Sequence, residues 1–428
     1  MLIVMIVFLV LLALGMPVAF AIGIGGLCFF LQHPELPFTM VAQLPVTQTQ
    51  TVPMLAIPLF IFAGNLMNST GITKRLIKLS TLLTGHMKGG LAQVSVVLST
   101  LLGGVSGSAT ADAAMESRIL GPSMIKRGYS KGYTAGVIGF TSLITATIPP
   151  GIGIIIYGTV GEVSIGQLFT AGLVVGLIMM IVNMLTVRVT AGIRQYRPEK
   201  ERRASLREIF SSLRETVWAL IFPILLLVGI RFGLFTPSEV GAFACVYAVV
   251  VGVLIYKELT VKKLVKTILV SVKDIGAVMF IIALSGIFGY GIPFDRVPQA
   301  LTGFITGMST SPFAVLSMVV LFLVFVGMFM EGSVAILLLT PILLPMVESL
   351  GVNPVHFGLI MCTTITMGLL TPPVGISMYT VCGILKCPTK EYIRESIPFF
   401  IAAIAVIMFM IFFPDVVMFL PKLLYGLR

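Results

Sequence analysis

Apolar stretches long enough to cross a lipid bilayer recur from one end of this chain to the other, separated by short polar segments. A helix needs roughly 20 predominantly apolar residues to span the hydrocarbon core. Spanning helices are expected at 1–31, 53–70, 132–160, 163–187, 216–232, 239–256, 274–292, 356–385 and 396–416. No polar stretch is long enough for a separate soluble domain, so residues 1–428 are expected to fold as a single all-α integral membrane domain.

Two further segments, 89–125 and 312–347, are each too long for one helix and have a glycine-rich, polar middle at 103–110 and 327–333. Irregular polar backbone at membrane depth is tolerated only inside protein or against a water-filled cavity. Each segment is therefore expected to form a re-entrant helical hairpin. If each instead formed two full spans, the orientations of the other helices would not change.

Composition supports a membrane protein and explains the positive charge. Hydrophobic residues make up 57% of the chain and charged residues only 11%, whereas soluble domains carry about 25% charged residues. The net charge of +11 comes from basic residues in short segments between apolar runs, which is the pattern of cytoplasmic loops. Nucleic-acid binding is therefore not expected. The five cysteines fit small apolar packing residues, not a disulfide framework or metal site.

The distribution of lysine and arginine predicts the orientation of the spans. The strongest basic segment, 188–214, is expected in the cytoplasm, and a second one follows at 257–273. The run at 274–292 then leaves the cytoplasm. Because the run at 1–31 lacks a basic start, it fits a retained helix and not a cleaved signal. Counting spans backwards places the N-terminus in the cytoplasm.

The two halves of the chain resemble each other. A first repeat at 53–160 matches a second repeat at 274–385, and a shift of about 223 residues pairs Gly104 with Gly327 and Pro149-Pro150 with Pro372-Pro373. The segments that flank the first hairpin are basic, whereas the equivalent segments of the second half contain Arg296 and little else. Equivalent loops are therefore expected on opposite faces of the membrane, as in inverted repeats that meet at a midplane substrate site.

Each repeat also contains a helix interrupted by two successive prolines, at 145–151 and 368–375. Proline lacks an amide donor and blocks the helical hydrogen bonds around it, so carbonyls on the preceding turn lose their partners. Such carbonyls and nearby hydroxyls suit a desolvated Na⁺. The half-helix that follows has free amides and a positive dipole end, which suits a substrate carboxylate. A simple kink is the alternative for one such pair, but two pairs at symmetric positions favour a functional role.

Carboxylates at membrane depth are expected to be functional. Asp112 and Glu331 lie in or near the two hairpin middles, and Arg118 is an alternative internal partner for Asp112. The candidate substrate- or Na⁺-binding residues are Ser106, Gly107, Ser108, Thr110, Asp112, Thr147, Pro149, Pro150, Gly151, Gly327, Glu331, Gly332, Ser333, Thr371, Pro372 and Pro373. Na⁺ is expected near Ser106, Ser108, Thr147, Ser333 and Thr371. No catalytic residue and no organic cofactor are expected.

A family resemblance rests on these residues together with others along nearly the whole chain. The residues that carry it are Gly15 to Ala19, Ile57 to Phe60, Ser106 to Ala109, Ala113-Ala114, Gly121 to Met124, Gly128-Tyr129, Ile148 to Pro150, Tyr157-Gly158 and Thr371 to Gly375. The sequence thereby resembles the large membrane subunit, DctM-like, of tripartite ATP-independent periplasmic (TRAP) transporters. Many relatives have serine after the first Pro-Pro pair, where this chain has Gly151. That difference puts a hydroxyl ligand at this position in doubt.

The resemblance implies Na⁺-coupled secondary import of a small organic anion, such as a C4-dicarboxylate, a sialic acid or a sugar acid. It also implies an elevator-type fold in the bacterial inner membrane, surrounded by lipid. A periplasmic substrate-binding protein would deliver the substrate. A small four-helix membrane subunit would accompany this chain as a separate polypeptide, since no such portion precedes Met1. The sequence leaves open which anion is carried, the Na⁺ stoichiometry and the oligomeric state.

Two alternative functions, a channel and a protease, fit the sequence less well. An ion or solute channel would need a static pore, but two broken helices in inverted repeats favour alternating access. An intramembrane serine protease is suggested by Gly104-Val105-Ser106-Gly107, but a serine nucleophile needs a base within hydrogen-bond reach. The histidines, at His33, His86 and His356, lie in a loop or near span ends.

Overall fold

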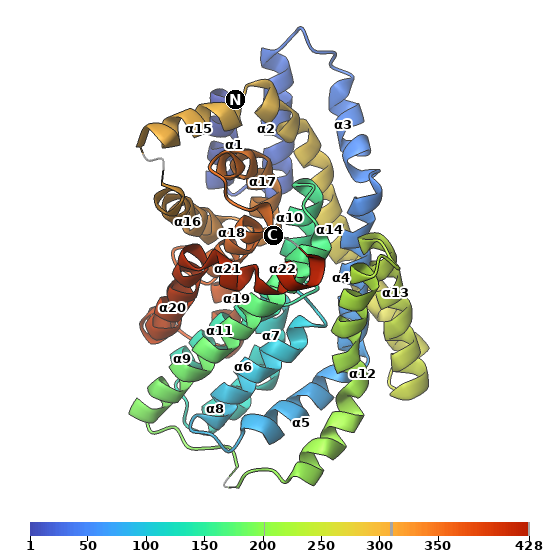
Figure 1. Ribbon diagram of the computed structural model, residues 1–428, viewed down its shortest axis with the longest axis vertical. Coiled ribbons are helices and arrows are strands. Elements are labelled where there is room, and N and C mark those ends of the chain that lie inside the picture. Colours follow the sequence, from blue (N-terminus) through green and yellow to red (C-terminus); the bar gives the residue numbers. More distant parts are fainter. Residues whose placement is uncertain (201, 309–310, 427–428) are drawn as a thin grey trace.

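The computed structural model describes residues 1–200, 202–308 and 311–426, and this part of the chain contains helices and no strands (Figure 1). Eight helices of the described part are long and apolar enough to span a membrane. The pair α9 and α10 would form a further, broken span, bent by 42°. The expectation of an all-α polytopic membrane protein is therefore confirmed.

The N-terminal segment differs from expectation, because 1–31 is not one helix. It forms α1 (Leu2–Ala13) and α2 (Val18–Gln32), which pack side by side. Gly15 adopts a left-handed conformation, with φ of 80°, and Pro17 supplies no amide donor, so the helix cannot continue. The α-amino group of Met1 pairs with Asp295, and His33 Nε2 lies 3.6 Å from the same carboxylate. The start of α1 and the end of α2 therefore both lie beside Asp295.

Helix α14 (Val261–Phe294) is the longest helix of the described chain and forms the surface on which the N-terminal region packs. The hairpin α1–α2 covers the end of α14 that leads to Asp295. There the ring centroids of Phe8 and Phe288 lie 5.5 Å apart. Helices α3 (Met40–Thr49) and α4 (Ala56–Ser69), joined by the short η1 (Val52–Leu55), run along α14 in the opposite direction. The expected span at 53–70 is thus extended by α3.

The first half continues with two helix pairs that break where polar and proline residues were noted. The helices are α5 (Ile72–Thr84), α6 (Gly90–Gly103), α7 (Ala109–Ile119), α8 (Gly121–Lys126), α9 (Lys131–Thr147), α10 (Ile152–Val160) and α11 (Ile165–Ile193). The break between α6 and α7 contains the glycine- and serine-rich middle. The break between α9 and α10 contains Pro149-Pro150, whose peptide bond is cis.

The second half repeats this order. Its helices are α14, α15 (Val297–Met308), α16 (Pro312–Phe329), α17 (Gly332–Ser349), α18 (Pro354–Gly368), α19 (Ile376–Leu385), α20 (Thr389–Phe412), α21 (Pro414–Val417) and α22 (Phe419–Tyr425). The Pro372-Pro373 bond is also cis. In Figure 1, α5 lies at the lower end of the molecule and its equivalent α15 at the upper end, near the N-terminus. Inverted repeats require this placement, and the orientation of the repeats in a membrane stays a prediction.

Helices α12 (Leu206–Arg231) and α13 (Pro237–Val250), with a π-helical end η2 (Val251–Ile255), connect the two halves. Both helices begin with a capping box, at Ser205 with Glu208 and at Thr236 with Glu239, and such boxes satisfy the first free amides of a helix. The basic segment 188–214 covers the end of α11, the loop before α12 and its first turns, with residue 201 outside the described part. Arg194 in this loop pairs with Glu395 of α20.

Candidate functional site

The tips of the two hairpins meet at one cavity of about 420 Å³. The loop between α6 and α7 and the start of α7 form one side, and the start of α17 forms another. Helices α4 and α14 face the two tips, and residues of α9, α10, α18 and α19 complete the lining. The predicted site residues in the cavity lining are Ser106, Gly107, Ser108, Thr110, Glu331, Gly332 and Ser333. The structure thus brings together residues from both halves that lie more than two hundred positions apart.

The tip of the first hairpin packs against the break between α9 and α10. Gly107 has a φ of 63°, which glycine adopts at little cost, and its carbonyl oxygen accepts a hydrogen bond from the Ile152 amide at 3.2 Å. A Cβ atom at Gly107 would overlap the Pro150 carbonyl oxygen. The tip of the first hairpin therefore packs directly against the first Pro-Pro break. Ala146, Ile152 and Gly153, which flank this break, line the cavity.

Asp112 lies directly behind this tip and is 1% exposed. The Ser106 hydroxyl donates to Asp112 Oδ2 at 2.5 Å, while Oδ1 has no hydrogen-bond partner. The Thr145 hydroxyl, which lies beside this carboxyl group, donates instead to the Ser99 carbonyl at 2.9 Å. Arg118 forms no ion pair with Asp112, so the alternative of an Asp112–Arg118 pair is wrong.

Glu116, one turn further along α7, is equally buried. Its carboxylate accepts hydrogen bonds from Ser95 at 2.5 Å and from Ser99 at 2.8 Å, both on α6. Ser95 also contacts the Thr141 hydroxyl on α9 at 3.1 Å. These hydroxyl contacts link α6, α7 and α9. In the sequence, the sign of such a polar contact is the pair Ser95 and Ser99, four residues apart on one helix face.

The second hairpin tip is built around Glu331. Its carboxylate caps α17, accepting from the Val334 amide at 3.2 Å and from the Ser333 hydroxyl at 3.2 Å. Gly327 does not line the cavity; a Cβ there would come within 2.5 Å of the Ile365 carbonyl oxygen, so it permits close packing of α16 on α18. Ser377 of α19 joins the two halves by a 2.6 Å hydrogen bond with Thr110.

The remaining predicted residues lie outside the cavity wall. The hydroxyls of Thr147 and Thr371 are buried and donate within their own helical turns, to Leu143 and Gly368 carbonyls, each at 2.8 Å. Residues absent from the wall are Asp112, Thr147, Pro149, Pro150, Gly151, Gly327, Thr371, Pro372 and Pro373. Pro372 and Pro373 are exposed. A Na⁺-binding role for Thr147 and Thr371 stays a prediction.

Sequence reasoning missed the wall that faces the hairpins. Asn65 and Asn68 of α4 and Asp274 of α14 line it. The Asn65 amide donates to Asp274 Oδ2 at 2.9 Å and to the Ser271 hydroxyl at 3.1 Å. The sequence could have indicated this wall, because Asn65 and Asn68 are two amide side chains three residues apart in an apolar run. Residues at this spacing lie on one face of a helix. Within the described residues no three His, Cys, Asp or Glu side chains come together as metal ligands.

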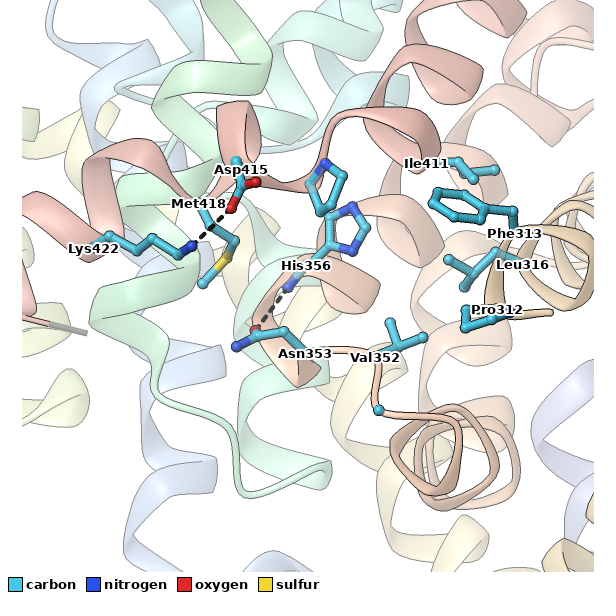
Figure 2. A pocket seen from close by; sticks show the side chains of 12 residues that line it. Pro312, Phe313, Leu316, Val352, Asn353, His356, Ile411, Asp415, Met418 and Lys422 are labelled. Carbon is cyan, nitrogen blue, oxygen red and sulfur yellow. Dashed lines mark hydrogen bonds and ion pairs between the residues drawn. The ribbon is translucent and has the colours of Figure 1, made fainter. Parts of the chain in front are cut away.

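A second cavity of about 420 Å³ lies between the start of α16, the start of α18 and the C-terminal helices (Figure 2). Asn353 caps α18, accepting from the Val355 and His356 amides. His356 Nε2 lies 2.8 Å from the Met410 carbonyl oxygen, and Lys422 Nζ donates to Asp415 at 2.7 Å. That hydrogen bond and the lysine charge lower the pKa of Asp415. None of the predicted site residues lines this cavity.

The sequence profile described as "Tripartite ATP-independent periplasmic transporter, DctM component" matches residues 5–416. The chain belongs to this family. Members are large permeases of secondary transporters for organic acids, and they work with a small membrane subunit and a periplasmic binding protein. The chain is therefore a membrane permease and not an enzyme, so the serine-protease alternative is wrong.

Curated relatives match the TRAP permease over nearly its full length. A putative TRAP transporter large permease protein of Haemophilus influenzae is 35% identical, covering 95% of each chain. The 2,3-diketo-L-gulonate TRAP transporter large permease YiaN of Escherichia coli is 32% identical, again over 95% of each chain. The sialic acid TRAP transporter large permease SiaM of Vibrio cholerae is 32% identical, covering 96% of each chain.

Two solved transporters share the fold of this TRAP permease. YdaH of Alcanivorax borkumensis aligns with a TM-score of 0.65, 12% identity and 87% coverage of each chain. MtrF of Neisseria gonorrhoeae aligns with a TM-score of 0.56 and 12% identity, covering 86% of this chain and 83% of the other. At this identity the likeness concerns the fold alone.

Proposed function

We propose that this TRAP permease imports a small organic anion by Na⁺ symport, through an elevator-type movement of the two hairpins against α4 and α14. The observation that carries the proposal is the meeting of both hairpin tips at one cavity, opposite a wall supplied by other helices. A cavity shared by two structural units suits alternating access, because sliding of one unit carries the bound solute across the membrane.

The proposed anion contacts lie at the first hairpin tip. Helix α7 begins at Ala109, beside the cavity, and its first amides and positive dipole end favour a carboxylate. The hydroxyls of Ser108 and Thr110 add donors on the same side. A small organic anion fits a cavity of about 420 Å³.

The proposed Na⁺ sites lie at the two hairpin tips, near Ser106 and Ser108 and near Glu331 and Ser333. Na⁺ prefers oxygen ligands, and both tips present hydroxyls, carboxylates and non-helical carbonyls. The unpartnered Oδ1 of the buried Asp112 supports a cation near the first tip, because a charged carboxylate buried without a counter-charge is strongly destabilising. Gly151, next to the first Pro-Pro pair, has no hydroxyl and therefore adds no side-chain ligand to such a site.

The orientation of the chain follows from its basic segments, with one revision. Lys126, Arg127 and the 257–273 segment are proposed to face the cytoplasm of a bacterium, with this permease in the inner membrane. Helix α14 then leads outward to Asp295, to which Met1 is paired. A cytoplasmic N-terminus is incompatible with this direction of α14, so the N-terminus is proposed to lie in the periplasm.

The proposed partners are a separate small four-helix membrane subunit and a periplasmic binding protein that delivers the substrate. The substrate is proposed to be a carboxylate, because relatives are named for sialic acid and 2,3-diketo-L-gulonate. The test is uptake into proteoliposomes that contain this permease and its small subunit, with the loaded binding protein outside. Uptake should require an inward Na⁺ gradient and stop when K⁺ replaces Na⁺. Unchanged uptake in K⁺ overturns Na⁺ coupling, and conduction at channel rates in bilayer recordings overturns the carrier mechanism.

A further inference from the structure

The cavity between the hairpins carries negative charge on one side and neutral donors on the other. Its carboxylates are Asp274 on α14 and Glu331 at the second hairpin tip, and both side chains are exposed to it. Among the described residues its lining contains no lysine, arginine or histidine. A second carboxylate on a bound substrate would therefore face carboxylates that have no basic side chain beside them in the described lining, and like charges repel each other.

The position of Asp274 is held by the surrounding helices. The Asn65 amide spans from α4 to donate to Asp274 Oδ2 at 2.9 Å, and it also donates to Ser271 one turn earlier on α14. Asp274 forms no ion pair with any described residue. The basic side chains of Lys263 and Lys266 line a neighbouring pocket that shares Asn65 but does not include Asp274. Asp274 therefore presents an oriented, unneutralised acceptor to the cavity.

The opposite side of the cavity has the reverse character. The start of α7 presents backbone amides, of which that of Ala111 donates to Ser108 Oγ, and this end of a helix favours negative charge. The Asp112 carboxylate in the same turn belongs to the proposed Na⁺ site. A molecule that satisfies both sides has a carboxylate at one end and hydrogen-bond donors at the other. A dicarboxylate satisfies only the first side.

We infer that Asp274 is a specificity-determining residue, which selects monocarboxylates whose far end carries ammonium or hydroxyl donors and rejects dicarboxylates. This inference rests on the proposed function, because it assigns the cavity to the transported anion. The carboxylate of the substrate lies at the first hairpin tip, and its donor-bearing end lies against Asp274 and Asn65. Glu331 belongs to a proposed Na⁺ site, where the bound cation offsets its charge, so Asp274 is the carboxylate of the lining that the substrate meets without a counter-ion.

The test compares four probes with the same four-carbon chain: 4-aminobutyrate, 4-hydroxybutyrate, butyrate and succinate. Binding to the purified complex of this permease with its small subunit is measured by calorimetric titration in saturating NaCl. The wild type should bind the amino and hydroxy acids most tightly and succinate most weakly. Asp274→Asn keeps the acceptor for Asn65 and removes the charge, so the preference for 4-aminobutyrate over succinate should fall about tenfold.

Asp415→Asn is the matched control, because Asp415 is an exposed carboxylate in α21, away from this cavity. It should leave the order of the four probes unchanged. Asp274→Ser provides a second variant, with the charge removed and a smaller side chain. Succinate binding as tightly as 4-aminobutyrate in the wild type, an unchanged ratio in both Asp274 variants, or no binding of any probe overturns the inference. The proposed function is judged separately, since Na⁺-dependent uptake of the natural substrate is unaffected by which probe binds.

Discussion

The Ser106 hydroxyl donates to the Asp112 carboxylate at 2.5 Å and thereby ties the tip of the first hairpin to the helix behind it. Asp112 is almost completely buried, and its second oxygen is free. A buried carboxylate stays charged only beside a counter-charge, and no described basic side chain supplies one to Asp112. The tip and a bound cation are therefore expected to stabilise each other.

Asp112→Asn should weaken Na⁺ binding while the protein still folds, because asparagine has a similar volume and retains an acceptor for Ser106. Loss of one charged ligand of this kind is worth about 1–3 kcal/mol, or roughly ten- to a hundredfold in affinity. The measurement is the Na⁺ concentration for half-maximal uptake in proteoliposomes. A wild-type Na⁺ dependence would show that Asp112 has only a structural role.

Ser108→Ala and Glu331→Gln test the two hairpin tips directly. The first removes a hydroxyl from the cavity wall and the second removes a charge without changing the shape of the α17 cap. Both should lower Na⁺-dependent uptake about tenfold or more at low Na⁺, with normal expression and assembly. If rate and Na⁺ dependence are those of the wild type in both variants, the hairpin tips are not the ion and substrate site.

Gly107→Ala should destabilise the site more than an ordinary glycine substitution. The left-handed backbone costs an alanine about 1–2 kcal/mol, and the added Cβ would overlap the Pro150 carbonyl oxygen. Uptake should therefore fall together with the thermal unfolding temperature. Gly192→Ala is the control, since a Cβ there meets nothing within 4 Å in helix α11, and it should be neutral or slightly stabilising. Equal behaviour of the two variants would contradict the close packing at the tip.

Cysteine labelling tests the inverted arrangement. Single cysteines at Lys126 and Glu348, both exposed, are introduced after replacement of the five native cysteines. An impermeant maleimide added outside spheroplasts should label Glu348→Cys and spare Lys126→Cys. Glu35→Cys should behave like Glu348→Cys, because residue 33 contacts Asp295 at the outward end of α14. Equal labelling of the cysteines at positions 126 and 348 would contradict the inverted arrangement of the repeats. Absence of labelling at position 35 would instead indicate a cytoplasmic N-terminus.

The sequence alone located the apolar segments and the helix breaks at the two hairpin middles and the two proline pairs. Hydropathy over about 20 residues is set by local composition, and the proline pairs forbid a continuous helix wherever they occur. The Gly/Ser-rich middles likewise fall between α6 and α7 and between α16 and α17. Hydropathy predicts one helix for the N-terminal run, because its apolar character continues through Gly15 and Pro17. The prediction is wrong because these two residues interrupt the helix.

The tertiary structure decided which side chains face one another. Asn65 and Asp274 meet across 209 positions, and Asp112 bonds with Ser106 instead of Arg118, because the rotation of each helix about its axis is set by packing against its neighbours. Thr147 and Thr371 lie behind the cavity wall for the same reason. Hydropathy and motif spacing thus determined that this chain crosses the membrane and where its helices break. Only long-range packing determined which polar groups share the cavity.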